Sequence, residues 1–148
     1  MLEVVTVPNI ILNQTCAKVT EFNSELQNLV NQMFLTMKIH QGIGLAAPQV
    51  GLSKRLFVVE VDKVKLVCIN PTVSLTGEEF DSEEACLSIP DTMVVVKRRK
   101  EVILDAFDEY GRRYQNSFTG LMAVVIQHEN DHLNGVLITD NFRKTGEL

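Results

Sequence analysis

Several features are missing from this sequence of 148 residues, and each absence argues against a class of protein. Basic residues are too few for a nucleic-acid surface, because 14 Lys and Arg stand against 19 Asp and Glu and the net charge is -5. No apolar run approaches the ~20 residues of a transmembrane helix. No signal peptide is recognisable, because Glu3 interrupts the first apolar residues and no basic segment precedes them. We therefore expect no direct nucleic-acid binding and no membrane association.

Cysteines are also sparse. Cys16, Cys68 and Cys86 form an odd set with no close spacing, which is not a disulfide framework and fits a reducing, intracellular setting. The chain has no internal repeat and no low-complexity linker. Its length predicts a single domain over residues 1–148, and such a chain buries roughly two-thirds of its unfolded surface without a disulfide or structural metal.

Apolar spacing predicts two helices and several strands. One helix should run from Glu21 to Gly42 with Thr20 as its N-cap, and the other from Thr119 to Gly135. The acidic run 78–84 should be a solvated face, residues 98–100 a basic turn, and Asn70-Pro71 the end of a strand. β-forming residues between turn signals predict strands at 56–61, 66–69, 93–97, 101–107 and 112–118.

Residues 42–51 read GIGLAAPQVG, which suits a tight loop rather than a helix or a central strand. The sequence leaves two interpretations open: a structural turn, or a loop whose backbone lies close to a ligand. Gln49 is the only side chain in the loop that can both donate and accept hydrogen bonds.

The second predicted helix carries the pattern H-E-x-x-H at residues 128–132. Residues four apart share one helix face, so His128 and His132 can aim two imidazoles at one point, on the same stripe as the apolar residues. Glu129 lies beside them, within reach of a water on a bound metal. Two imidazoles and a carboxylate predict a metal site that moves protons to or from water.

The third ligand should lie upstream of this helix. One zinc-protease pattern would place a further His at position 138, which is Ile138. Another pattern takes a Glu from a separate downstream helix, whereas Glu147 lies in the tail of the chain. Among upstream candidates Cys86 stands out, because it lies in a stretch with Ser and Pro and a thiolate binds divalent transition metals well.

Three segments in this order, GIGLAAPQVG at 42–51, EACLS at 84–88 and QHENDHLNG at 127–135, resemble the motifs of the peptide deformylase family. The resemblance spans nearly the whole chain. It implies an α+β fold, with antiparallel strands packed around a central metal-binding helix. It also implies removal of the N-formyl group from the N-terminal methionine of newly made proteins, with release of formate.

The resemblance also implies roles for individual residues. Cys86, His128 and His132 would bind one divalent metal, usually Fe²⁺ in the cell, with Zn²⁺, Ni²⁺ or Co²⁺ as alternatives. Glu129 would act as general base and acid on metal-bound water. Gln49 and the Leu87 N–H would stabilise the oxyanion, and Asp131 and Arg98 would orient the site. Glu84 would border the cleft. The pocket for the methionine side chain would be lined by Ile43, Gly44, Leu121, Val124 and Val125.

Two residues depart from the family pattern. Ala85 stands where the family has glycine, which would crowd the peptide or cost on the order of 1 kcal/mol if that position needs a positive φ. Met93 stands where bacterial members often have a basic residue. The short tail fits a minimal member of bacterial, viral or organellar origin. We expect a monomer in the cytoplasm, in a host cytoplasm or in an organelle, acting on N-formylmethionyl nascent peptides near the ribosome.

Two other function classes use the same residues. An H-E-x-x-H metallopeptidase is disfavoured because its downstream ligand is missing. A structural zinc protein or a formyl-peptide-binding relative is disfavoured because a structural site has four protein ligands, whereas three are evident and Glu129 is retained.

Overall fold

Five antiparallel strands and two α-helices make up most of residues 2–140, the part of the chain that the computed structural model describes. The sheet has the order β1-β2-β3-β4-β5, and the fold is α+β as predicted. The elements are η1 (Ile10–Asn13), α1 (Ser24–Ile39), β1 (Gly44–Ala46), η2 (Ala47–Val50), β2 (Leu56–Val61), β3 (Val64–Cys86), β4 (Ile89–Phe107), β5 (Arg113–Thr119) and α2 (Gly120–Leu133).

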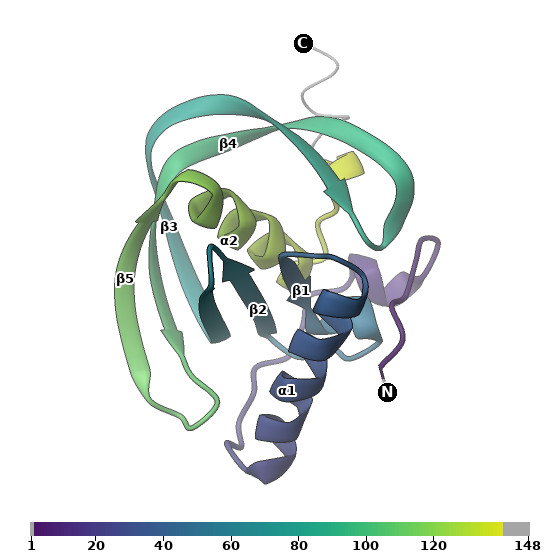
Figure 1. The fold of residues 1–148 in the computed structure, drawn as a ribbon, viewed down its shortest axis with the longest axis vertical. Helices are drawn as coiled ribbons and strands as arrows, with labels where there is room; N and C mark the ends of the chain where they lie inside the picture. The colour runs from purple at the N-terminus through teal and green to yellow at the C-terminus, as the bar shows by residue number, and fades with distance from the viewer. Residues whose placement is uncertain (1, 141–148) are drawn as a thin grey trace.

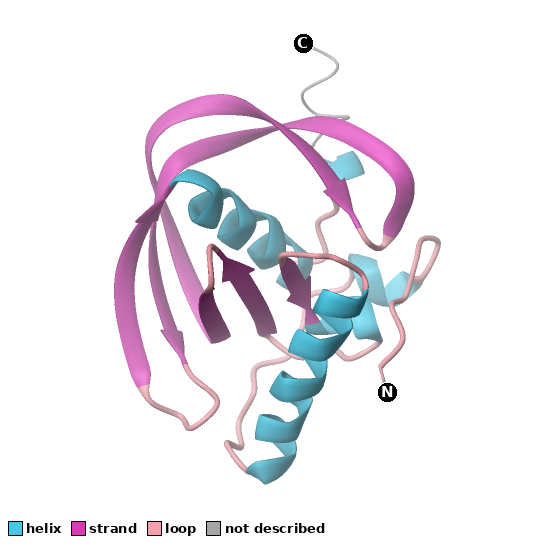
Figure 2. Cartoon of the chain, in the orientation of Figure 1, coloured by secondary structure: helices cyan, strands magenta, loops and turns pink. Residues whose placement is uncertain are grey.

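The long strands β3 and β4 form one curved ribbon around α2 (Figures 1 and 2). Their pairing extends from Ile69↔Phe107 to Cys86↔Ile89, with register shifts that include one between Ala85 and Cys86. Such irregularities bend a strand and increase its twist, which lets the ribbon curve around the helix. The helix thus lies inside the bend, in contact with β1, β2, β4 and β5.

The prediction of a basic turn at residues 98–100 was wrong. Residues 78–84 belong to β3 and residues 98–100 belong to β4, where they lie on neighbouring strands. Asp81 pairs with Lys97 in the strand register, and their charged groups lie 2.5 Å apart. Opposite charges on facing positions favour strand pairing. The acidic run is a solvated face, as predicted, at Glu78, Glu79, Asp81 and Glu83, whereas Glu84 is buried.

Two predicted boundaries were also wrong. α1 begins at Ser24, because the side chain of Asn23 rather than Thr20 accepts a hydrogen bond from the N–H of Leu26. β3 continues through Asn70-Pro71, where Asn70 has φ +49° and the register shifts. A bulge at this point tolerates proline, which cannot donate to the ladder.

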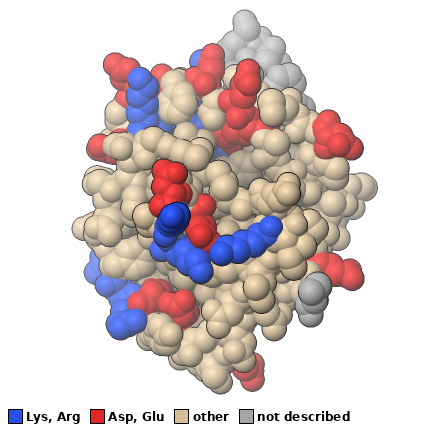
Figure 3. All heavy atoms as spheres, in the orientation of Figure 1, with Lys and Arg blue, Asp and Glu red and all other residues tan. Residues whose placement is uncertain are grey.

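Apolar side chains form the core on both sides of the short strands β1 and β2. The buried face of α2, with Ala123 and Ile126, packs against Phe57 of β2 and Leu104 of β4. A second cluster joins α1 to β1, β2 and η2. No helix among residues 2–140 is long and apolar enough to cross a membrane. On the face drawn in Figure 3, acidic and basic side chains are intermixed on a mostly uncharged surface.

Candidate metal centre

The helix α2 carries both candidate histidine ligands on one face. It starts after Thr119, the predicted cap position, although that side chain makes no capping hydrogen bond, and Gly120 enters the helix with φ +64°. The ring centroids of His128 and His132 lie 5.2 Å apart. The four-residue spacing therefore brings the imidazoles together as the sequence predicted.

Cys86 faces these histidines from the inner side of the ribbon. Alternation along β3 places Ser82, Glu84 and Cys86 on the buried side, toward α2. The Sγ of Cys86 lies 3.4 Å from Nε2 of His132. One ligand atom from each of Cys86, His128 and His132 lies within 4.8 Å of the others, although 42 residues separate the cysteine from the first histidine along the sequence.

The donor set fits a divalent transition metal. A thiolate and two imidazoles suit Fe²⁺, Zn²⁺, Ni²⁺ or Co²⁺, and three protein ligands leave room for water or substrate. Burial lowers the pKa of His128, but Cys86 and Glu84 raise it to about 10, so a metal ion would have to displace a proton from Nε2 of this ring. Burial and the positive charges of His128 and Arg98 lower the pKa of His132, so this imidazole is neutral as a ligand must be.

A chain of charged groups orients His128. Burial alone would raise the pKa of Glu84, but hydrogen bonds from Arg98 and His128 lower it to about 2. The ionised carboxylate can only accept, so Nδ1 of His128 donates to Oε1 of Glu84 over 3.0 Å and Nε2 remains for a metal. Arg98 donates to both oxygens of Glu84, at 2.8 and 2.7 Å, and to Asp131 at 2.7 Å.

The structure gives Glu84 and Arg98 more than their predicted roles at the cleft border and in the orientation of the site. Glu84 does line the cleft, yet it is buried and its carboxylate is taken up by Arg98 and His128. Arg98 is 4% exposed and lies within β4, not in a basic turn. Local charge in the sequence gave no sign of this burial, because the partners of the guanidinium lie 14 and 33 residues away.

Glu129 is buried beside the cluster. Its Oε2 lies 3.9 Å from Nε2 of His128, and within the described part of the chain its Oε1 has no hydrogen-bond partner. Burial raises the pKa of Glu129 to about 7, and the charge on His128 opposes this rise. A carboxyl group with a pKa near neutrality can both take up and release a proton at working pH.

The glycine-rich segment lies against this carboxylate, and it is not the loop that the sequence predicted, because Gly44–Ala46 form β1 and Ala47–Val50 form η2. A Cβ added at Gly44 would lie 2.7 Å from Oε2 of Glu129 and 2.8 Å from Cγ1 of Val125. The β1 backbone therefore needs glycine here, because it lies close to the side chains of Glu129 and Val125.

Gln49 is held at the other side of Cys86. Its Oε1 accepts from the N–H of Ala46 at 2.9 Å, and its Nε2 donates to Cys86 Sγ at 3.5 Å and to Ser88 Oγ at 3.3 Å. Leu87 and Ser88 form the two-residue turn between β3 and β4. In such a turn the flanking residues make the ladder hydrogen bonds, so the Leu87 N–H is not required by the ladder. The sequence analysis did not predict that Ser88 accepts a hydrogen bond from Gln49. Its position two residues after Cys86 could have indicated a place near the site.

Gln127 is a second side chain that the sequence analysis did not single out. Its side-chain amide accepts from the N–H of Arg99 at 3.0 Å and donates to the carbonyl of Arg99 at 2.8 Å. This pair of hydrogen bonds fixes α2 against β4 immediately beside His128. In the sequence, only the position of Gln127 at the start of QHENDHLNG suggested that it belongs to the site.

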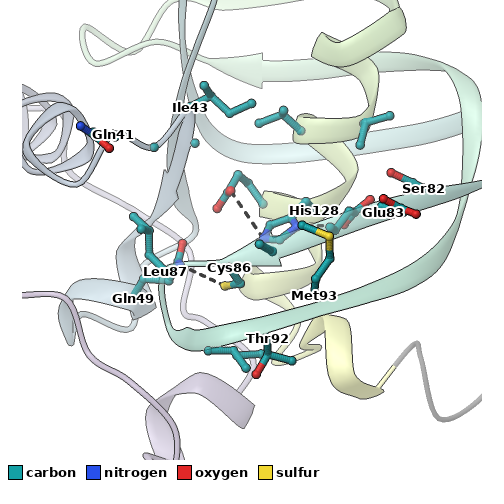
Figure 4. A pocket seen from close by; sticks show the side chains of 18 of the residues that line it. Gln41, Ile43, Gln49, Ser82, Glu83, Cys86, Leu87, Thr92, Met93 and His128 are labelled. Carbon is teal, nitrogen blue, oxygen red and sulfur yellow. Dashed lines mark hydrogen bonds and ion pairs between the residues drawn. The ribbon is translucent and has the colours of Figure 1, made fainter.

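A cleft of about 860 Å³ opens onto the cluster, with Gln49, Cys86 and His128 directed toward one another at its base (Figure 4). The predicted pocket residues all line it: Ile43, Gly44, Leu121, Val124 and Val125. Ala85, Leu87 and Met93 line it as well. Three predicted site residues do not line the cleft: His132, Arg98 and Asp131. Asp131 accepts a hydrogen bond from Arg98, and Arg98 in turn holds Glu84.

The chain is similar to known proteins over nearly its whole length. The model of the polypeptide deformylase family matches residues 1–147. The peptide deformylase of Heliobacterium modesticaldum is 43% identical over 139 residues, which cover 93% of this chain and 91% of the relative. That of Thermodesulfovibrio yellowstonii is 41% identical over 145 residues, covering 95% and 88%.

Solved structures show the same similarity. The crystal structure of peptide deformylase from Thermotoga maritima superposes with a TM-score of 0.93 at 36% identity, covering 96% of this chain and 97% of that one. A peptide deformylase from Synechococcus elongatus, solved in complex with actinonin, gives a TM-score of 0.92 at 40% identity, covering 95% and 78%.

Proposed function

Because the chain belongs to the polypeptide deformylase family, it is a hydrolase of that type, and we propose that it removes the formyl group from N-formylmethionyl peptides. The observation that carries the proposal is the meeting of Cys86, His128 and His132 at the base of a cleft, with Glu129 buried beside them. The products are formate and a peptide with a free amino terminus.

Cys86, His128 and His132 would hold one divalent metal, which we propose is Fe²⁺ in the cell. When bound, the metal supplies Lewis acidity that activates water and polarises the formyl carbonyl. Glu84 keeps the His128 ring in the orientation that leaves Nε2 for the metal, and Arg98 keeps Glu84 ionised. Loss of this support typically costs 10–100-fold in metal affinity or activity.

Glu129 moves the proton. Its carboxylate takes a proton from the attacking water and then delivers it to the amine nitrogen as the C–N bond breaks. A pKa of about 7 suits both halves of this task. The lack of a partner on Oε1, among the residues described, means that no protein group competes for this oxygen.

Gln49 and Leu87 stabilise the negative charge that develops on the formyl oxygen. The Gln49 side chain is fixed at its Oε1 by Ala46, so its Nε2 is directed toward Cys86 without further adjustment. The Leu87 N–H provides a second donor from the neighbouring turn. Donors fixed in advance in this way contribute roughly 10²–10³ each in kcat.

The apolar wall of the cleft accepts the methionine side chain. Val124 and Val125 lie one turn before His128 on α2, and Ile43 and Leu121 are exposed at the margin, at 42% and 54%. The formyl group would then lie over the ligands while methionine follows the apolar stripe. We further propose that the protein acts as a monomer in the cytoplasm, on nascent chains near the ribosome.

The test uses formyl-Met-Ala-Ser and measures formate with Fe²⁺- or Ni²⁺-loaded, anaerobically purified protein. We expect turnover by the wild type, and a loss on the order of 10²–10⁴ in kcat for Glu129→Gln with the metal retained. Glu79→Gln, the same substitution at an exposed position of β3, should leave kcat unchanged. Absence of turnover at full metal occupancy would contradict the proposed activity, and cleavage of internal peptide bonds would favour a peptidase instead.

A further inference from the structure

The segment before η1 contacts both loops that carry the proposed oxyanion donors. The N–H of Val5 donates to the carbonyl of Gln49 at 2.7 Å, and the N–H of Val7 donates to the carbonyl of Ser88 at 2.9 Å. One proposed oxyanion donor is the side-chain amide of Gln49. The other is the backbone N–H of Leu87, the residue immediately before Ser88. We infer that Val5 and Val7 are positioning residues, whose backbone N–H groups set the spacing between the two oxyanion donors.

The backbone geometry suits this role. Val5 and Val7 donate from alternate residues of one short stretch, whereas the N–H of Thr6 between them makes no backbone hydrogen bond among residues 2–140. The two acceptors lie 39 residues apart in the sequence, in η2 and in the β3–β4 turn. The segment therefore connects two elements that are neighbours in space and separate in the chain.

Side chains anchor the segment at both ends. Leu2 packs on the apolar cluster between α1 and η2, whereas Val5 packs on the cluster around Cys86, Ile89 and Val96. The Gln49 side chain also links η2 to the β3–β4 turn, through a hydrogen bond to Ser88 Oγ at 3.3 Å. This contact is long for such a bond, so the two backbone contacts carry much of the constraint.

This inference rests on the proposed function, because the two donors matter only if a formyl oxygen binds between them. A displacement of about 1 Å in a positioning group can cost 10²-fold in rate. Loss of one of the two hydrogen bonds leaves the other, so we expect a smaller effect, on the order of 10-fold in kcat. KM should stay within about twofold, because the donors act on charge that develops in the transition state.

The experiment replaces one backbone N–H at a time by an ester oxygen, with every side chain kept. Cys16 allows synthetic residues 1–15 to be joined to residues 16–148 by ligation at the cysteine. Esters at Val5 and at Val7 remove the two donors. An ester at Thr6, which is exposed and whose N–H makes no backbone hydrogen bond among residues 2–140, is the matched control. Val5→Pro compared with Thr6→Pro gives the same contrast by mutagenesis.

Three readouts separate positioning from general stability. They are kcat and KM of the Co²⁺-loaded protein on formyl-Met-Ala-Ser, the Co²⁺ absorption spectrum, and amide hydrogen exchange of the metal-free protein. The Val5 and Val7 esters should lower kcat with KM and the spectrum unchanged. They should also speed exchange in residues 47–50 and 86–89, and not in α1. The Thr6 ester should match the wild type in all three.

Two outcomes would overturn the inference: equal kcat in all three esters, or a rise in KM at constant kcat. Faster exchange throughout the protein would show a merely structural segment and would overturn it as well. If the wild type itself releases no formate, the proposed function fails, while the exchange data still report whether the segment holds the two loops.

Discussion

Gly44→Ala tests whether the backbone at the start of β1 defines the position of Glu129. The new Cβ would meet Oε2 and Cγ of Glu129 at 2.7 and 2.9 Å, and Cγ1 of Val125 at 2.8 Å. Ordinary contacts begin near 3.4 Å, so each atom must retreat by about half an ångström or more. Glu129 is only 4% exposed and has little space into which to move.

The magnitude follows from two separate costs. Forcing a methyl group into a packed site typically destabilises a protein by about 1–3 kcal/mol. Displacing a general base by a large fraction of an ångström should lower kcat on the order of 10²-fold. The metal should stay bound, because none of the three crowded atoms belongs to Cys86, His128 or His132.

The assay compares Gly44→Ala with Gly42→Ala, which lies two residues before it and outside β1. At position 42 the nearest atom to the new Cβ is the end of the Leu87 side chain at 3.2 Å, which can turn aside, so little loss is expected. Combined with Glu129→Gln, Gly44→Ala should add almost no further loss in kcat, because the displaced group is already disabled. Wild-type kcat in Gly44→Ala, or losses that simply add in the double variant, would refute the reasoning.

Three further predictions concern the metal, the helix end and a turn. Cys86→Ala should abolish tight metal binding, measured as metal per chain after dialysis, and stoichiometric metal in the variant would show that the third ligand lies elsewhere. Gly135→Ala should lower the free energy of unfolding by more than about 2 kcal/mol in urea titrations, because φ is +72° and the Cβ would meet the Asn13 backbone at 2.6 Å; an unchanged midpoint would contradict this. Asp108→Ala should cost on the order of 1 kcal/mol at pH 7, since its carboxylate accepts from two turn N–H groups. Burial opposes the charge, but those hydrogen bonds and the Arg112 guanidinium lower the pKa of Asp108. The stabilisation is therefore present above the ordinary pKa of 3.8 and disappears as the pH falls below that value. A difference in stability between wild type and variant that stays constant down to pH 2 would contradict this prediction.

The chemistry of the site was predictable where it depends on short spacing. His128 and His132 lie on one face of α2 because the helical period is 3.6 residues, and this requires no knowledge of the rest of the fold. Cys86 needed the absence of a downstream ligand and then the family motifs, since no local rule links it to a helix 42 residues away. Its position within 4.8 Å of the histidines is a finding of the structure.

The long strands were the least predictable part. Local pattern ended a strand at Asn70-Pro71 and predicted no strand over the acidic run 78–84, which it interpreted as a solvated face, because charge and proline both disfavour a strand interior. The bulge at Asn70 and the pairing of Asp81 with Lys97 overcome these penalties through contacts between distant residues. Arg98 shows the same limit, because its burial depends on Glu84 and Asp131, which no local window contains.

The two-residue turn at Leu87-Ser88 has a consequence for the order of folding. Pairing that starts at Cys86↔Ile89 can extend residue by residue to Ile69↔Phe107, so the ribbon forms through contacts that begin locally. α2 also forms from local contacts, and it brings its two histidines already aligned. The three ligands therefore come together in a single long-range event, the docking of α2 into the ribbon. The moment at which tight metal binding appears during refolding therefore reports when α2 docks into the ribbon.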